Sequence, residues 1–139
     1  TLRCSCDDKN VYFLVEVLDR SLLRGDYATV YLSSGDSKSL TNGAKRLQVS
    51  MDGLKSTETY AGKWNNAEMG VEVKTYVCND TNEDRIDNYG YIAEISVPRS
   101  SLTISSGQVL VNFSITDNKE EEAVSDVSSI SRWIPVAGL

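Results

Sequence analysis

Two aromatic side chains lie four residues apart in a polar stretch of the chain. Tyr60 and Trp64 occur in the segment STETYAGKWNNAEMG, and two amide side chains, Asn65 and Asn66, follow directly. Sugar rings present C–H faces that pack on aromatic rings, while their hydroxyl groups need planar polar partners. The combination predicts a sugar-binding surface. The alternative is that Trp64 covers the edge of a sheet, since tryptophan is usually largely buried.

A second group of polar residues has the spacing of calcium ligands. Asp80, Asn82 and Asp84 alternate in the segment NDTNEDRIDN, and oxygen ligands at such spacing can wrap a Ca²⁺ ion. Arg85 stands where an EF-hand loop requires glycine, and Tyr91 stands where it requires glutamate. The segment is therefore not an EF-hand. It is either a weak calcium site or a solvated acidic loop.

Composition excludes several classes of function. The net charge is −6, and the cationic residues form no patch, which argues against nucleic acid and against an anionic membrane surface. No apolar run approaches the ~20 residues of a membrane span. Histidine is absent, which removes the commonest general base and the commonest metal ligand. We expect no enzymatic activity, and no cofactor beyond a structural calcium ion.

Three cysteines leave the redox compartment open. Cys4 and Cys6 are two residues apart, so on a strand both point to one face, and Cys78 ends another strand-like run. The spacing lacks the C-x-x-C pattern and the fourth ligand of a zinc site. Buried free thiols, or one disulfide with an odd thiol left over, are the expected states.

The length of 139 residues suits one domain, spanning 1–139. The first residues, TLRCSCDDKN, have neither the charged nor the apolar region of a signal peptide. We therefore expect this domain to have been excised from a larger protein.

The elements that must position these residues are strands. Val11, Phe13, Val15 and Val17 alternate with more polar residues, and period-two patterns of this kind indicate strands. Pro98 is expected to end one strand because it cannot donate to a ladder, with a short 3₁₀ turn after it. Strands are predicted at 11–19, 27–34, 46–52, 70–78, 91–97 and 109–116, and loops at 53–69, 79–88 and 117–131.

Strands joined by short turns, with no convincing amphipathic helix, predict an all-β protein. We expect an antiparallel β-sandwich, with a jelly-roll-like or an immunoglobulin-like topology. The long loops are expected to gather at its ends and to carry the function.

The order of segments along the chain is similar to that of a known family. The segments are DDKNVYFLVEVLD, GDYATVYLSS, KRLQVSMDG, YGYIAEISVPRSSL, GQVLVNFSITDN and ISRWIPVAGL. Together they resemble the family 9 carbohydrate-binding modules and their DOMON-like relatives, from about residue 7 onward. The family's opening segment, IDG…D…W, has no counterpart here.

The resemblance implies a set of sugar-binding candidates. Such modules hold a terminal sugar ring between two tryptophans, and the matching places here are Leu23 and Trp133. The family's glutamate and arginine in the adjoining strands fall on Thr29 and Gln48. Asn118 opens the loop that leads to the second tryptophan. Of the two positions where the family has a tryptophan platform for the sugar ring, only one is therefore aromatic in this chain.

Two of these candidates also have a structural interpretation. Trp133 can be a core or rim residue that closes the last strand, and Gln48 can be an ordinary polar residue on an outer sheet face. Both interpretations are kept open beside the sugar-binding one.

The resemblance implies a non-catalytic module that binds a glycan or polysaccharide. Such a module is extracellular or on the cell surface, and is covalently linked to the catalytic domain of a glycan-degrading enzyme or to an anchoring domain. The alternative is a structural or protein-interaction β-sandwich that has lost sugar binding. A DOMON-type haem site is disfavoured because the chain has no histidine for the usual Met/His axial pair.

Overall fold

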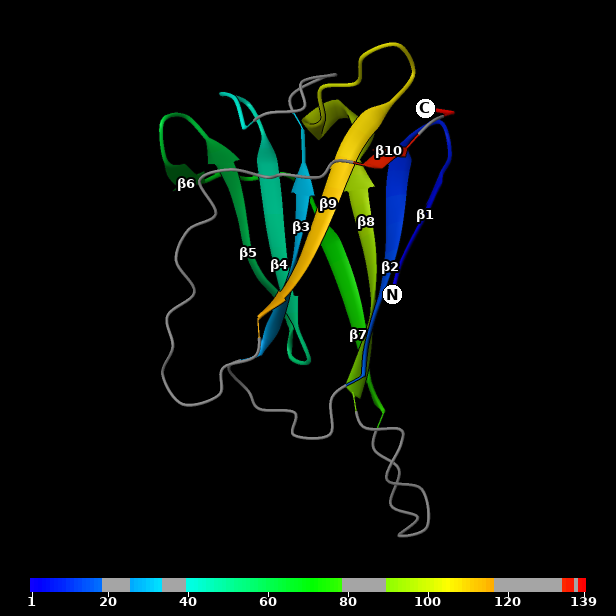
Figure 1. The fold of residues 1–139 in the computed structure, drawn as a ribbon. Coiled ribbons are helices and arrows are strands. Elements are labelled where there is room, and N and C mark those ends of the chain that lie inside the picture. Colours follow the sequence, from blue (N-terminus) through cyan, green and yellow to red (C-terminus); the bar gives the residue numbers. More distant parts are fainter. Residues whose placement is uncertain (19–25, 34–39, 79–89, 117–133, 137) are drawn as a thin grey trace, which may run out of the picture.

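The computed structural model describes residues 1–18, 26–33, 40–78, 90–116, 134–136 and 138–139. These residues form two antiparallel sheets packed face to face, which confirms the predicted all-β sandwich (Figure 1). The four-stranded sheet has the order β1 (Leu2–Cys6), β2 (Asn10–Leu18), β8 (Gly90–Pro98) and β7 (Glu72–Cys78). The six-stranded sheet has the order β10 (Ile134–Val136), β9 (Val109–Thr116), β3 (Tyr27–Leu32), β4 (Lys45–Ser50), β5 (Gly53–Tyr60) and β6 (Trp64–Asn66).

Alternation along the strands builds the core between the two sheets. In β2 every second residue, from Val11 to Val17, is buried, and the residues between them are half-buried. The largest fully buried side chains come from both sheets: Phe13, Tyr91 and Ile95 from one, and Leu32 and Leu47 from the other. The Tyr91 hydroxyl also donates a hydrogen bond of 3.3 Å across the core to the Val49 carbonyl.

The strand order is that of an immunoglobulin variable-type sandwich. That fold places strands A, B, E and D opposite G, F, C, C′ and C″, and β1, β2, β8 and β7 lie opposite β10, β9, β3, β4 and β5 in the same order. β6 adds one further strand at the edge. In a jelly roll the strand pairs are nested along the chain, so that each pair encloses the next. Here β2 pairs with β8 and β3 pairs with β9, so neither pair encloses the other. Neither β2 nor β9 contains a cysteine, so no inter-sheet disulfide of the antibody type joins them.

One predicted loop is wrong. The stretch 53–69 contains β5 and β6, which form a hairpin at the edge of the six-stranded sheet. The side chains of β5 are half-buried or exposed on both faces, so no apolar period of two marks it as a strand. The predicted turn at Asp52–Gly53 brings this polar strand beside β4, with a bulge between Gln48 and Val49.

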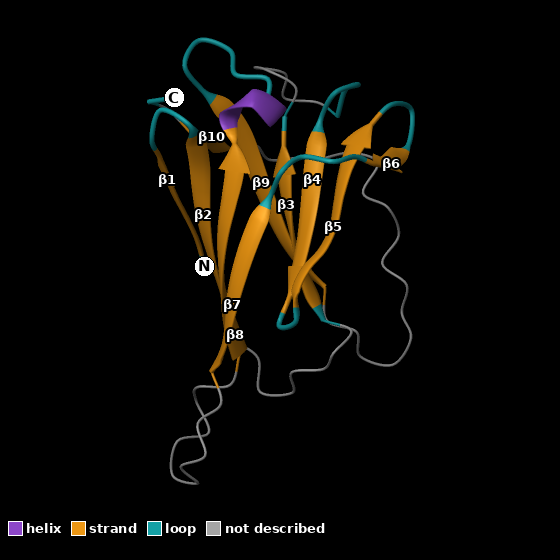
Figure 2. Ribbon diagram, turned by 180° about the vertical axis from the view of Figure 1, so that it is seen from behind, coloured by secondary structure: helices purple, strands orange, loops and turns teal. Residues whose placement is uncertain are grey.

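The short 3₁₀ turn expected after Pro98 is present. It spans Arg99–Ser101 and lies at one end of the sandwich, next to the last residue of β8 (Figure 2). It is the only helical segment among the described residues.

The N-terminal strand corrects part of the expectation for the cysteines. β1 is an edge strand, so Cys4 is exposed and Cys6 is only half-buried, and both are free thiols. The Cys6 thiol lies 3.5 Å from the Gly138 carbonyl oxygen. The thiol of Cys4 is therefore not the buried one that was expected.

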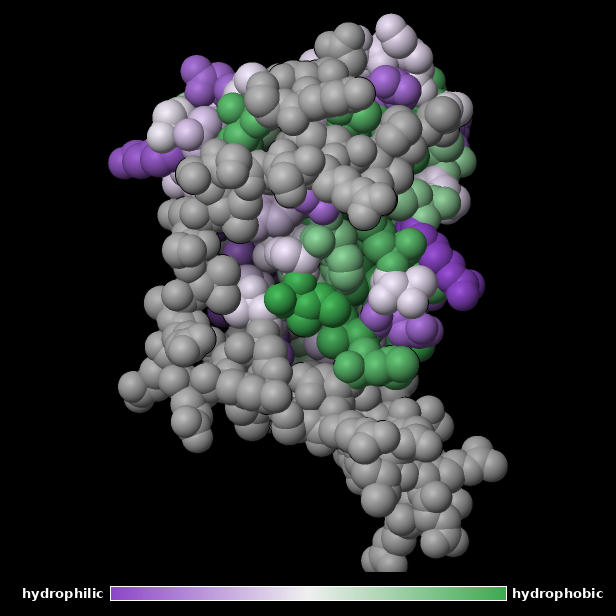
Figure 3. Space-filling view, in the orientation of Figure 1, coloured by the Kyte–Doolittle hydropathy of each residue, from purple (hydrophilic) through white to green (hydrophobic). Residues whose placement is uncertain are grey.

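One edge of the sandwich exposes apolar side chains. β10 pairs only with the first three residues of β9, so the rest of β9 has no described neighbour on that side. Ile115 and Leu18, near the ends of β9 and β2, are 50% and 70% exposed. Apolar side chains gather over this region on the face shown in Figure 3.

The turn between β1 and β2 is organised by one carboxylate. Asp7 Oδ1 accepts hydrogen bonds from the backbone N–H groups of Lys9 (2.8 Å) and Asn10 (2.7 Å). Its Oδ2 accepts a 2.6 Å bond from the Tyr12 hydroxyl. The Tyr12 bond first, and then the two backbone bonds, lower the pKa of Asp7 below its ordinary value.

This lowered pKa predicts a pH dependence of stability. The Asp7 contribution is fully present above the ordinary aspartate pKa of about 3.9, and is lost as pH falls through the lower pKa of the folded state. Asp7→Asn should therefore lower the melting temperature at pH 7, and the difference from the wild type should shrink toward pH 2.5. Thermal melts across that range check this. A difference that stays constant with pH would show that the carboxylate charge does not matter.

Candidate functional site

Polar and aromatic side chains line up on the outer face of the six-stranded sheet. Tyr31, Arg46, Glu58 and Asn66 are consecutive partners across β3, β4, β5 and β6. Partners in a ladder point to the same side of a sheet, and residues two apart along a strand do so as well. The intervening residues Val30 and Leu47 fill the core, so this row faces away from it.

A parallel row lies two residues further along the same strands. It consists of Thr29, Gln48 and Ser56, which pair across β3, β4 and β5. The Ser56 hydroxyl donates a 3.1 Å hydrogen bond to Gln48 Oε1. Thr29 is only 2% exposed, so Gln48 and Ser56 are the more accessible members of this row.

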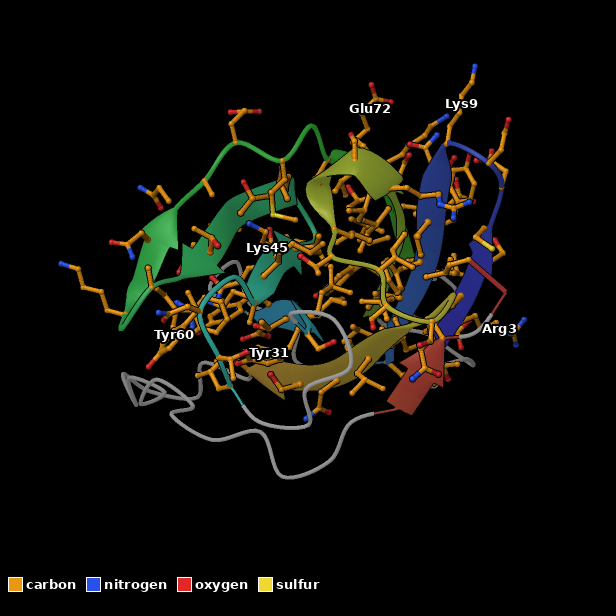
Figure 4. All side chains as sticks on the ribbon, turned by 90° about the horizontal axis from the view of Figure 1, so that it is seen from above. Arg3, Lys9, Tyr31, Lys45, Tyr60 and Glu72 are labelled. Carbon is orange, nitrogen blue, oxygen red and sulfur yellow. The ribbon has the colours of Figure 1, made fainter. Side chains whose placement is uncertain are left out.

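Three aromatic rings gather at the β6 end of this face. The centroid of Trp64 lies 5.3 Å from that of Tyr60, edge to face, and 6.1 Å from that of Tyr31. Both distances are within the 4.5–7 Å range of favourable ring pairs. Figure 4 shows Tyr31 and Tyr60 close together, on the side of the molecule away from Glu72.

A charged pair is built into the same cluster. Arg46 Nε and Nη2 both donate to Glu58 Oε2, at 3.0 and 2.6 Å, and the two side chains are only 10% and 13% exposed. The Arg46 guanidinium carbon also lies 4.5 Å from the centroid of the Trp64 ring. One face of the indole is therefore occupied by a cation whose charge Glu58 compensates.

The indole N–H of Trp64 has no hydrogen-bond partner among the described residues, although the nitrogen is buried. An unpaired buried donor costs about 1–3 kcal/mol. The ring contacts with Arg46, Tyr31 and Tyr60 must offset this cost, so packing rather than hydrogen bonding holds Trp64 in place. Tyr60 and Trp64 are both half-buried, whereas Tyr31 is buried, so Tyr60 and Trp64 are the accessible rings of the cluster.

Backbone hydrogen bonds fix the position of Tyr60. Its N–H donates to the Ala44 carbonyl and its carbonyl accepts from the Gly43 N–H, both at 2.8 Å. The turn that follows is tied by a 3.1 Å bond from the Gly62 N–H to Asn42 Oδ1. Gly62 has φ +74°, a conformation that favours glycine in such a tight turn. The ring of Tyr60 is therefore carried on a rigid backbone.

The structure brings four of the predicted sugar-binding residues onto one face: Thr29, Gln48, Tyr60 and Trp64. Asn65 is not among them. It alternates with Trp64 along β6 and therefore points to the opposite side, where its Nδ2 donates to the Lys63 carbonyl. Tyr60 and Gln48 lie at opposite ends of the face. Gln48 pairs with Ser56, and Tyr60 is four residues, or about 13 Å, further along β5.

Other predicted residues lie outside the described part of the chain. These are Trp133 and Asn118 of the sugar-binding set, Leu23 at the family's first platform, and the calcium candidates Asp80, Asn82 and Asp84. Within the described residues, no group of three or more acidic, cysteine or histidine side chains is placed to hold a metal ion. Nor does any described helix have the length and apolar character needed to cross a membrane.

Sequence reasoning missed Tyr31, Arg46 and Glu58. The pattern that could have found them is the alternation of polar residues on the outward side of each strand. Thr29 with Tyr31, Arg46 with Gln48, and Glu58 with Tyr60 are each two residues apart and so share a face. Only the register of β3, β4 and β5 shows that the three pairs lie side by side.

Comparison with known proteins gives no family assignment. No family model matches the chain, and neither a curated protein nor a solved structure matches it.

Proposed function

We propose that this protein is a non-catalytic carbohydrate-binding module whose ligand packs on Tyr60, at the β6 end of the six-stranded sheet. One observation carries the proposal: Tyr60, Trp64 and Tyr31 form an aromatic cluster on the same sheet face as Gln48, Ser56 and the Arg46–Glu58 pair. Aromatic rings offer the apolar face that a sugar ring needs, and the amide, hydroxyl and carboxylate groups offer partners for its hydroxyls.

The proposed function includes a location and a parent protein. A module of this kind acts outside the cell or on its surface, attached to a glycan-degrading catalytic domain or an anchoring domain. It holds the parent protein on its polysaccharide and leaves bond cleavage to another domain.

Tyr60→Ala is the variant that tests the proposal. Removing a central anchor typically costs at least about 2 kcal/mol, which is more than a tenfold loss of affinity. The fold should survive, because the backbone bonds of Tyr60 do not depend on its ring. Isothermal titration with a glycan that the wild type binds measures the loss, and a thermal melt confirms folding.

Leu18→Ala is the control for removing an exposed apolar side chain. Leu18 is 70% exposed and ends β2 in the four-stranded sheet, so it is not part of the aromatic cluster. Affinity should be unchanged in this variant. If Tyr60→Ala binds as tightly as Leu18→Ala, the aromatic cluster is not the binding site.

A second candidate function is a structural or protein-interaction sandwich. It is favoured by the depth of the cluster, since Tyr31, Arg46 and the Trp64 indole nitrogen are all buried. On this account the cluster only fastens the β5–β6 hairpin to the sheet. Tyr60→Ala would then lower the melting temperature, and neither it nor the wild type would bind any glycan.

A further inference from the structure

The outer face of the four-stranded sheet carries two neighbouring rows of side chains that cross all four strands. Ladder register places residues of β1, β2, β8 and β7 side by side in each row. We call these rows together the cross-strand band. One row is Ser5, Tyr12, Ser96 and Glu72, and the other is Arg3, Leu14, Glu94 and Lys74.

The band is hollowed in two adjoining places. One hollow, of about 310 Å³, lies toward β7, and the other, of about 380 Å³, lies toward β1. Tyr12 and Glu94 line both, so the two hollows adjoin at the middle of the band. Each volume falls at the lower end of the ~300–1,000 Å³ typical of small-molecule sites.

The aromatic ring at the middle of the band is held in place. The Tyr12 hydroxyl donates to Asp7 Oδ2 at 2.6 Å, and it accepts a 3.3 Å hydrogen bond from Asn10 Nδ2. Because its polar end is fixed, the half-buried ring is available as a pre-positioned apolar surface. Leu14, two residues along the same strand, extends this apolar surface.

The charged groups of the band balance one another without pairing. Arg3 and Lys74 contribute two positive charges, and Glu72 and Glu94 contribute two negative ones. Among the described residues none of these four forms an ion pair with another within 4 Å, and the Lys74 ammonium instead lies 5.5 Å from the centroid of the Tyr76 ring. All four side chains are exposed, so they can form hydrogen bonds with the hydroxyl groups of a ligand. Because their charges sum to zero, the band favours neither an anionic nor a cationic ligand.

The shape of the band favours a chain of sugar rings. Four strands about 4.8 Å apart span about 14 Å, which is longer than one sugar ring. The backbone groups of β2 and β8 are already bonded within the sheet, so a peptide could not add to this face as a strand does at an edge. Contacts must come from side chains alone.

We propose that the cross-strand band is a second binding surface, for a neutral oligosaccharide chain that lies across β1, β2, β8 and β7. The inference rests on the proposed function, and it concerns the sheet opposite the Tyr60 cluster. Figure 4 shows Arg3 and Glu72 at the two ends of the four-stranded sheet, away from Tyr31 and Tyr60. Two surfaces on one module would let it hold two strands of a polysaccharide at once.

Nuclear magnetic resonance titration of the ¹⁵N-labelled domain tests this proposal. The probes are cellohexaose, xylohexaose and mannohexaose, with hexagalacturonic acid as the charged comparison. At least one neutral probe should shift the amide signals of Tyr12, Glu94 and Lys74, also in the Tyr60→Ala background. Glu94→Ala in that background should weaken binding about tenfold or more, because it removes a charged hydrogen-bond acceptor from the middle of the band.

Glu68→Ala is the control for removing one exposed carboxylate, because Glu68 lies outside the band. Its affinity should match that of the Tyr60→Ala background alone. If Tyr60→Ala abolishes all binding and Glu94→Ala in the wild type changes nothing, the band is not a site while the proposed function stands. If hexagalacturonic acid binds as tightly as the neutral probes, the neutral specificity is wrong. If no probe binds the wild type, both proposals fail for these glycans.

Discussion

Gly90→Ala is expected to destabilise the protein by about 3 kcal/mol or more. Gly90 begins β8 opposite Leu18, with φ +154°, and an added Cβ would stand 1.9 Å from the Val17 carbonyl oxygen. That oxygen belongs to the backbone of the partner strand, so it cannot move aside without breaking the ladder. For a domain of this size, such a loss corresponds to a fall in melting temperature of roughly 10 °C.

Gly53→Ala separates the steric clash from the backbone strain. Gly53 also has a positive φ, +116°, but no atom lies within 4 Å of the position that a Cβ would take. Urea denaturation of both variants should therefore show a cost for Gly90→Ala that exceeds that for Gly53→Ala by about 2 kcal/mol. Equal costs would mean that β2 and β8 are not packed in this register.

Phe13→Ala should cost about 3–5 kcal/mol, the usual range for removing a buried phenylalanine. Phe13 is 2% exposed, and it lies between Cys4 and Ile95 in the ladder, at the centre of the four-stranded sheet. Truncation leaves a cavity in the core that the two sheets cannot close without sliding against each other.

Leu14→Ala provides the matched comparison for Phe13→Ala. Leu14 is the next residue along β2, so it faces outward and is only half-buried. Its truncation should cost less than about 1 kcal/mol. Denaturant titration measures both costs. Similar costs for the two variants would contradict the assignment of the inner and outer faces of β2.

The sequence predicted the strands that carry strong apolar alternation. β2 and β8 face the core with Val11, Phe13, Ile95 and Val97, and the residues between them face outward as their period requires. Pro98 ends its strand and is followed by the expected 3₁₀ turn. In these strands local propensity, side-chain pattern and burial agree, and for this reason they could be predicted from the sequence.

The sequence could not predict β5, because that strand carries no apolar period. Its pairing with β4 follows from the Asp52–Gly53 turn and from side-chain partners such as Ser56 with Gln48 and Glu58 with Arg46. Such pairings depend on register, which a single sequence does not specify for polar strands. The aromatic cluster could not be predicted for the same reason, because it depends on the register of polar strands. Tyr31 and Trp64 are 33 positions apart in the chain and meet only across β4 and β5.

A glycan-array screen of the isolated domain tests whether it binds glycans through Tyr60. The wild type and Leu18→Ala should bind the same set of glycans with equal signal, and Tyr60→Ala should give a weaker signal on each of them while keeping its fold. The proposed function is contradicted if the folded wild type binds no glycan on the array, or if Tyr60→Ala binds every glycan as strongly as the wild type does.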